Sequence, residues 1–212
     1  MNRHFLIIIA EGILAIVILG SMFVWVTSKP PTQQSQAVQQ EDPMADHHNP
    51  KPADTQIFNS LVNQPAPDFN LTSFSGETIT LSRLQGKNVV LFFNEGLMCY
   101  PACWDQIAAF GKDNSFAKVN TQVLSIVIDP KVQWEQAVSQ MPDLASGTVL
   151  LDTDKTASSA YGVMTLDSSM HRGQFPGHSY VLIDEKGVVR FIWDDPQMAI
   201  RNKELLEQIA KL

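Results

Sequence analysis

The chain has 212 residues, with 15 Lys or Arg against 22 Asp or Glu and a formal net charge of -7. This length suits one compact domain with terminal extensions, and a hydrophobic fraction of 44% is enough for an ordinary core. The acidic balance, without any cluster of Lys or Arg, argues against nucleic acid as a partner, because phosphate binding requires concentrated basic charge.

The amino-terminal segment predicts a membrane anchor. Residues 5–26 form an apolar run in which Glu11 is the only charged residue. This matches the roughly 20 residues that a spanning helix needs, and no small-residue cleavage site follows. We therefore expect residues 1–27 to be an uncleaved transmembrane helix in contact with lipid. Arg3 in the short basic start favours a cytoplasmic amino terminus. The remainder of this single-pass protein of the cell membrane is then expected outside the cytoplasm.

Residues 28–56 are rich in proline and glutamine and contain few aliphatic residues. Such a composition cannot bury a core, so it predicts a disordered linker. His47 and His48 lie within it, and we interpret them as solvated residues, because a metal site normally needs preoriented ligands.

Residues 57–212 have the pattern of one globular α/β domain, in which strands alternate with helices. The predicted strands are 68–71, 78–81, 88–93, 122–128, 148–151, 180–183 and 188–193, and the predicted helices are 103–116, 131–140, 155–161 and 202–211. This alternation indicates a sheet with parallel pairs. The first two strands and the last two are each close enough to form a hairpin, so we expect antiparallel additions to that sheet.

Both cysteines of the chain lie in the segment Cys99-Tyr-Pro-Ala-Cys103, between the predicted strand 88–93 and the helix 103–116. Sites in open α/β sheets gather at the carboxyl ends of strands, and a helix amino terminus stabilises a thiolate. A loop this short constrains the unfolded chain little, so the pair indicates redox chemistry rather than a structural staple. Cys99, nearer the loop, is the expected exposed, attacking thiol, and Cys103 the resolving thiol.

The spacing permits a disulfide between these cysteines without requiring one. Residues four apart on a helix have Cβ atoms about 5–6 Å apart, whereas a disulfide needs about 3.5–4.5 Å. A small adjustment closes this gap if Cys99 lies ahead of the helix. The alternative is a pair of reduced, buried cysteines that act as small hydrophobic residues.

Several segments spread over residues 64–212 resemble the redoxin group, which comprises the AhpC/TSA peroxiredoxins and their thioredoxin-like relatives. They are residues 66–69, 81–87, 151–154, 160–163, 181–184 and 187–190. The resemblance implies a thioredoxin-like (peroxiredoxin-like) sheet flanked by helices. It also implies an oxidoreductase or antioxidant protein that uses no cofactor and acts on protein thiols, protein disulfides or peroxide.

The cysteine segment departs from the patterns of this group. Peroxiredoxins typically carry Pro-x-x-x-Thr/Ser-x-x-Cys, but here Gly96 and Tyr100 occupy the hydroxyl position ahead of Cys99 and Cys103. Thioredoxin-type sites have two residues between the cysteines, and here there are three. Thiol–disulfide exchange and peroxide reduction both remain open, as does a redoxin domain that acts only as an extracytoplasmic binding module.

His178 is the third candidate site residue. It precedes the predicted strand 180–183, where thioredoxin-like reductases have a cis-proline and peroxiredoxins often have an arginine. The resemblance therefore places His178 near Cys99, where a histidine can lower a thiol pKa or relay protons. His171 is expected to be an ordinary loop residue.

A weaker similarity connects the same side chains to the Sco-type copper chaperones, which are membrane-anchored thioredoxin folds. Thiolates and imidazole suit copper. Here Tyr100 and Trp104 follow the cysteines where Sco proteins usually have proline. The alternative to the oxidoreductase is thus a copper-binding chaperone that uses Cys99, Cys103 and His178.

Overall fold

The computed structural model describes residues 52–212. The predicted anchor at residues 1–27 and nearly all of the predicted linker at residues 28–56 lie outside this range. Within residues 52–212, none of the helices combines the length and the apolar character that crossing a membrane requires.

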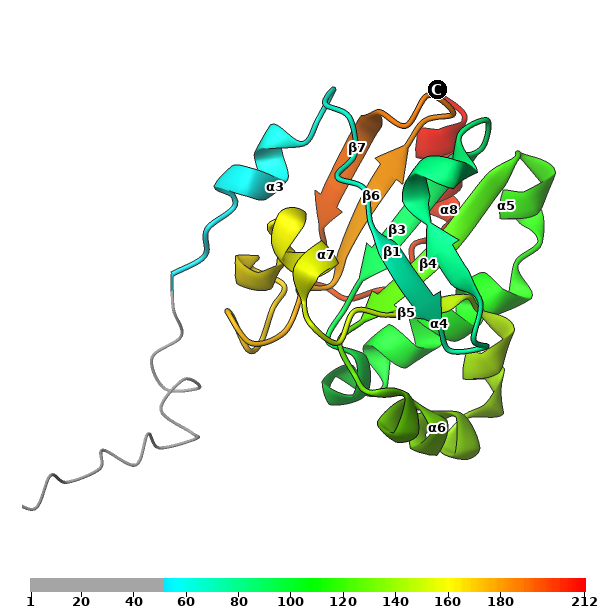
Figure 1. Cartoon of the computed structure of the whole chain (residues 1–212), viewed down its shortest axis with the longest axis vertical. Coiled ribbons are helices and arrows are strands. Elements are labelled where there is room, and N and C mark those ends of the chain that lie inside the picture. The colour runs from blue at the N-terminus through cyan, green and yellow to red at the C-terminus, as the bar shows by residue number, and fades with distance from the viewer. Residues whose placement is uncertain (1–51) are drawn as a thin grey trace, which may run out of the picture. The chain divides into compact units, whose positions relative to one another are not determined.

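A seven-stranded sheet with the order β2-β1-β5-β4-β3-β6-β7 forms the centre of the domain (Figure 1). The strands are β1 (Asn70–Ser73), β2 (Thr78–Thr80), β3 (Asn88–Phe93), β4 (Thr121–Val127), β5 (Val149–Leu151), β6 (Ser179–Ile183) and β7 (Val189–Asp194). The three inner strands β5, β4 and β3 run parallel, and the hairpins β1–β2 and β6–β7 extend the sheet at its two edges as antiparallel additions.

Helices cover both faces of this sheet. The α-helices are α3 (Gln56–Ser60), α4 (Ala102–Lys112), α5 (Ser115–Lys118), α6 (Lys131–Gln140), α7 (Thr156–Ala160) and α8 (Asn202–Ile209). Short 3-10 helices are η1 (Leu81–Leu84), η2 (Gly96–Cys99), η3 (Pro142–Ser146) and η4 (Val163–Thr165). Successive strand residues point to opposite faces. In β3, Leu91 therefore joins the core with α3 and α7, whereas Phe92 joins the core with α4, α6 and α8.

Most predicted elements are present. The predicted strand 88–93 and helix 131–140 coincide with β3 and α6, and both predicted hairpins form. The predicted helix 103–116 is wrong at its end, because Asp113 leaves the helical conformation and its carboxylate accepts the N–H of Ser115 at 2.9 Å. The helix α3 was not predicted. Its Phe58 is buried and Asp54 bonds to Thr165, so the folded part begins slightly before residue 57.

Strand register brings the candidate residues together. Antiparallel pairing of β3 with β6 places Phe93 opposite Ser179, so the residues that follow β3 meet the residue that precedes β6. Parallel pairing of β3 with β4 sets Phe93 beside Ile126, so the segment after β4 lies at the same edge. The two cysteines, Cys99 and Cys103, therefore lie at the same end of the sheet as His178 and Asp129.

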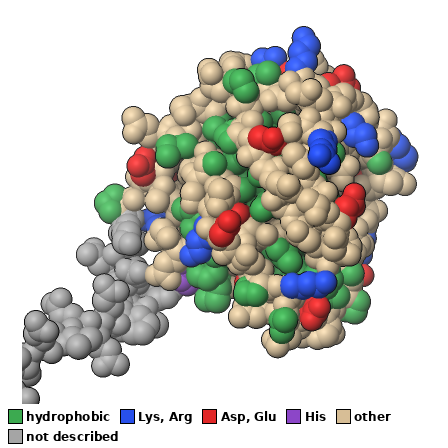
Figure 2. Space-filling model, in the orientation of Figure 1, with side chains coloured by type: hydrophobic (Ala, Val, Ile, Leu, Met, Phe, Trp, Pro, Cys, Tyr) green, Lys and Arg blue, Asp and Glu red, His purple; other side chains and the backbone are tan. Residues whose placement is uncertain are grey.

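Charged side chains are distributed over the surface of the domain. Lys and Arg are interspersed with Asp and Glu on the face shown in Figure 2. Several charged side chains of the domain are paired, such as Lys112 with Asp143 and Arg190 with Asp184. Exposed ion pairs of this kind add at most about 1 kcal/mol each to stability. Most of the stability therefore comes from the two hydrophobic cores, one on each face of the sheet.

Candidate functional site

Cys99 and Cys103 form a disulfide, with Cα atoms 5.4 Å apart. Cys99 ends η2, and Cys103 lies in the first turn of α4, with Pro101 between them ahead of the helix. The prediction that this spacing permits a bridge is confirmed. The prediction that Cys99 is exposed is wrong for this oxidised form, since Cys99 is 2% exposed and Cys103 is 0% exposed.

The loop after β7 explains why Cys99 is buried. Its Met198 places Sδ 3.8 Å from Cys99 Sγ, in a backbone conformation with φ +50°. The loop is held by Asp195, whose carboxylate accepts two hydrogen bonds from the guanidinium of Arg201 at 2.7 and 3.0 Å. Arg201 also lies 4.6 Å from the ring centroid of Trp193. This loop therefore holds a thioether over the outer sulfur of the disulfide.

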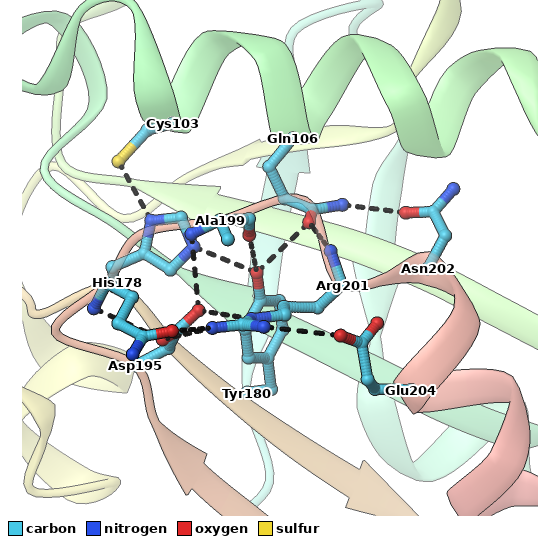
Figure 3. Close-up of polar contacts among 10 residues, drawn as sticks. Cys103, Gln106, His178, Tyr180, Asp195, Ala199, Arg201, Asn202 and Glu204 are labelled. Carbon is cyan, nitrogen blue, oxygen red and sulfur yellow. Dashed lines mark hydrogen bonds and ion pairs between the residues drawn. The ribbon is translucent and has the colours of Figure 1, made fainter.

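His178 lies on the inner side of the disulfide and is fully buried. Its Nδ1 is 3.4 Å from Cys103 Sγ, and its Nε2 is 2.8 Å from the hydroxyl of Tyr180 (Figure 3). Burial lowers the pKa of His178 to about 4; the negative charge of Asp195 opposes this shift and the positive charge of Arg201 reinforces it. The expected proximity to the cysteines is confirmed, but the nearest sulfur partner is Cys103 rather than Cys99.

Tyr180 and Gln106 extend the polar contacts of His178 into the helices. The Tyr180 hydroxyl donates to Gln106 Oε1 at 3.1 Å, and Gln106 Nε2 donates to Asn202 Oδ1 at 2.8 Å. All three side chains meet in the core between β6, α4 and the start of α8 (Figure 3). Sequence reasoning missed them. The available signals were a glutamine one turn after Cys103 and a tyrosine two residues after His178, on the same strand face.

Glu95 is a buried carboxylate between β3 and the cysteines, and it was also missed. Its Oε1 accepts the backbone N–H groups of Met170 and His171 at 2.6 and 3.1 Å, and its Oε2 lies 2.9 Å from His171 Nδ1. His171 is therefore more than an ordinary loop residue, which corrects its prediction. These contacts attach the segment before the cysteines to the loop that leads to His178.

Asp129 supports the other side of the cysteine turn. Its Oδ2 accepts the backbone N–H of Leu97 at 3.2 Å, and burial raises the pKa of its carboxyl to about 6. Gly96 adopts φ +57°, and a Cβ at this position would overlap the Asp129 carboxylate. This contact gives a physical reason for glycine where a peroxiredoxin pattern has a hydroxyl residue.

A model of the AhpC/TSA family matches residues 62–192. The chain belongs to the AhpC/TSA family. A putative peroxiredoxin, ycf42, of Pyropia yezoensis is 33% identical over 144 residues, which cover 61% of this chain and 66% of that protein, slightly less than two thirds. A putative peroxiredoxin, bcp, of Coxiella burnetii is 34% identical over 136 residues, which cover 62% of this chain and 87% of that protein.

Solved structures are similar in fold. The mitochondrial 2-Cys peroxiredoxin of Plasmodium falciparum has a TM-score of 0.58 and 26% identity, over 71% of this chain and 93% of that chain. Mycobacterium bovis AhpC has a TM-score of 0.59 and 23% identity, over 70% of this chain and 89% of that chain. The predicted thioredoxin-like, peroxiredoxin-like fold is therefore confirmed.

The family assignment favours thiol redox chemistry over copper binding as the interpretation of the site. The matched family model is that of AhpC/TSA, and the two curated relatives are both named putative peroxiredoxins. The ligand atoms of Cys99, Cys103 and His178 do lie within 4.8 Å of one another. The comparisons nevertheless give the Sco-type alternative no support, and the two sulfurs are joined to each other here.

Proposed function

We propose that this protein is a peroxiredoxin-like thiol peroxidase that cycles between a dithiol and the Cys99–Cys103 disulfide. The observation that carries the proposal is this disulfide at the start of α4, with His178 Nδ1 3.4 Å from one of its sulfurs. A buried polar side chain aimed at a redox-capable sulfur is typical of a reactive thiol site.

The proposed cycle has three balanced steps. The Cys99 thiolate attacks a peroxide oxygen, the O–O bond breaks, and a sulfenic acid forms while water or an alcohol leaves. Cys103 then attacks Cys99 Sγ, which forms the disulfide and releases water. A dithiol partner protein reduces the disulfide through a mixed disulfide and is itself oxidised.

Position within the fold supports the roles of the two cysteines. Cys99 lies between the exposed side chains of Met98 and Tyr100, whereas Cys103 lies beneath it against His178. Cys99 therefore lies nearer the surface than Cys103, beneath Met198, and we expect a peroxide or partner thiol to meet it first. Direct thiol–disulfide exchange with a protein substrate would use the same pair in the same order.

Single-cysteine variants test this function. Wild-type protein should consume hydrogen peroxide with dithiothreitol as reductant, and Cys99→Ser should abolish consumption. Without dithiothreitol, which would itself reduce a sulfenic acid, Cys103→Ser should react once and accumulate a sulfenic acid that dimedone traps on Cys99. Peroxide consumption that survives Cys99→Ser, or a sulfenic acid trapped on Cys103 instead, would contradict the assignment.

We also propose that residues 1–27 anchor the protein in the cell membrane as a single-pass helix, with residues 57–212 outside the cytoplasm. The apolar run at residues 5–26 supports this location. Membrane fractionation tests it, because deletion of residues 2–27 should move the protein to the soluble fraction. External protease should digest the full-length protein in intact spheroplasts; complete protection there would contradict the orientation.

A further inference from the structure

The donor and the acceptor of each hydrogen bond in the series Asn202, Gln106, Tyr180 and His178 can be assigned, beginning at Asn202. Asn202 Nδ2 lies 3.2 Å from the carbonyl oxygen of Ala109 and 3.0 Å from the carboxylate of Asp113, and both of these groups only accept. The amide oxygen of Asn202 therefore faces Gln106, whose Nε2 donates to it at 2.8 Å. This places Gln106 Oε1 on the side of Tyr180.

A second contact fixes the same orientation of Gln106. Its Oε1 accepts the backbone N–H of Arg201 at 2.7 Å, and a backbone N–H can only donate. Tyr180 Oη lies 3.1 Å from this acceptor and 3.5 Å from the carbonyl oxygen of Ala199. The single hydroxyl proton of Tyr180 is therefore directed to an acceptor on the helix side and away from His178.

The tautomer of His178 follows from this geometry. Because the Tyr180 proton is already donated, its oxygen accepts from His178 Nε2 at 2.8 Å (Figure 3). A neutral imidazole carries one N–H, so Nδ1 presents a lone pair to Cys103 Sγ at 3.4 Å. Burial keeps His178 neutral near pH 7, since it lowers the pKa to about 4.

We propose that Tyr180 and Gln106 are positioning residues that hold His178 in its Nε2–H tautomer, so that Nδ1 accepts the proton of the Cys103 thiol. This inference rests on the proposed function. The Cys103 S–H bond breaks, its proton moves to Nδ1, and the sulfur electron pair forms the bond to Cys99. The leaving hydroxide or partner thiolate then takes the proton.

The groups around His178 favour this role. Asp195 and Arg201 are the charged groups that influence its pKa, and their effects oppose each other. Asp195 and Arg201 also form an ion pair with each other, in which Arg201 Nε lies 2.7 Å from Asp195 Oδ2. The ring of Phe92 in β3 packs against the imidazole, with the two ring centroids 4.7 Å apart. Apart from Cys103, the described contacts of the imidazole thus offer Nδ1 no competing acid.

Nitrogen-15 NMR of the histidine rings in the reduced protein tests the tautomer directly. We expect His178 to show a protonated Nε2 and an unprotonated Nδ1 at pH 7. Tyr180→Phe removes the acceptor and should shift His178 toward the Nδ1–H form. Tyr161→Phe is the matched control, because Tyr161 is equally buried but donates at 2.8 Å to Pro67, in the core on the other sheet face. An Nδ1–H tautomer in the wild type would overturn the proposal.

Disulfide closure tests the proton transfer. Dithiobis(nitrobenzoate) labels Cys99 of the reduced protein, and attack by Cys103 then releases a second coloured thiolate. Closure should be about tenfold slower in Tyr180→Phe and in Gln106→Leu than in Tyr161→Phe. This is less than the roughly hundredfold or greater effect of removing a general base, because His178 remains but is no longer held in the required tautomer. In the two slow variants the rate should increase with pH up to the thiol pKa.

The outcomes separate this inference from the proposed function. Equal closure rates in all three variants would overturn the positioning roles. If the wild type releases no second thiolate at all, the dithiol cycle itself fails, while the NMR result still decides the tautomer. Gln106→Leu retains the Tyr180 ring, so it keeps the test decisive if Tyr180→Phe does not fold.

Discussion

At the scale of single residues, Gly96 shows how closely the cysteine turn is fitted to its support. Replacing Gly96 with Ala combines a φ of +57° with overlap of the new Cβ on the Asp129 carboxylate. We expect the free energy of unfolding to fall by about 2–5 kcal/mol, the sum of about 1–2 kcal/mol of backbone strain and about 1–3 kcal/mol of overpacking. Urea unfolding measures this change.

Gly76→Ala is the matched control for that substitution. Gly76 has φ +95°, but an added methyl group would have no neighbour within 4 Å, so only the backbone strain of about 1–2 kcal/mol applies. If Gly96→Ala lowers the free energy of unfolding by no more than Gly76→Ala does, close contact with Asp129 is not the reason that position 96 requires glycine.

The buried carboxyl of Asp129 predicts a pH dependence of stability. Its pKa is raised from 3.8 to about 6 in the fold, so the folded protein binds more protons than the unfolded chain between pH 4 and pH 6. Stability contributed by this group therefore decreases as the pH rises through that window, by on the order of 2 kcal/mol. Asp129→Asn should remove this decrease in urea titrations at pH 4, 5 and 6. A variant with the same pH slope as wild type would contradict the assignment.

Sequence reasoning identified some site residues and missed others for a physical reason. Cys99, Cys103 and His178 stand out because spacing and family resemblance locate them. Asp129 and Glu95 act through hydrogen bonds to backbone groups 32 and 75 residues away in sequence, and only the folded chain supplies those partners. Burial of Cys99 was missed because Met198, which lies over it, comes from a loop almost a hundred residues downstream.

At the scale of elements, the loop after β7 covers the disulfide on the Cys99 side. Met198→Ala removes the thioether that lies 3.8 Å from Cys99 Sγ. Reduction of the disulfide by dithiothreitol should become about threefold faster or more, because access is one of the factors that set exchange rates. Stopped-flow tryptophan fluorescence can follow it, since Trp104 packs in the same core as both cysteines.

Met164→Ala is a suitable control for this loop prediction. Met164 is a half-buried methionine in η4, so its removal reports any general effect of losing a thioether. Equal acceleration in both variants would indicate general loosening of the domain rather than uncovering of Cys99.

Element boundaries show what pattern alone can establish. The strand β3 was predicted to the residue because a continuous apolar run covered on both faces has clear limits. The end of α4 was missed because the Asp113 carboxylate accepts a hydrogen bond from the Ser115 N–H, which competes with continuation of the helix. The short helix α3 offers too few periodic positions for a sequence signal, although its Phe58 is buried.

At the scale of the whole domain, reduction should leave the fold intact. The disulfide closes a loop with a sequence separation of 4. A loop this short contributes about 2 kcal/mol by the chain-entropy relation, whereas the two cores extend over both faces of the sheet. Urea unfolding with and without dithiothreitol should therefore differ by no more than about 2 kcal/mol. Loss of cooperative unfolding on reduction would show that the disulfide is structural.

The sequence order of strands and helices was sufficient to predict the class of fold, because local periodicity and family resemblance agree over residues 64–212. It was not sufficient to predict which residues of two distant strands lie opposite each other. The pairing of Phe93 with Ser179, which brings His178 to the cysteines, depends on the register of two strands separated by more than eighty residues. Register of this kind is set by packing of the whole sheet.

Burial of both sulfurs affects how fast the oxidised protein returns to the dithiol form. In the proposed cycle, oxidation ends with a disulfide from which solvent and reductant are excluded by Met198 and its loop. Reduction then requires the Met198 side chain to move away from Cys99 Sγ, so we expect its rate to depend on this motion as well as on the reductant. We therefore expect the oxidised form to persist after the peroxide is consumed, because a reductant must reach a sulfur whose residue is only 2% exposed.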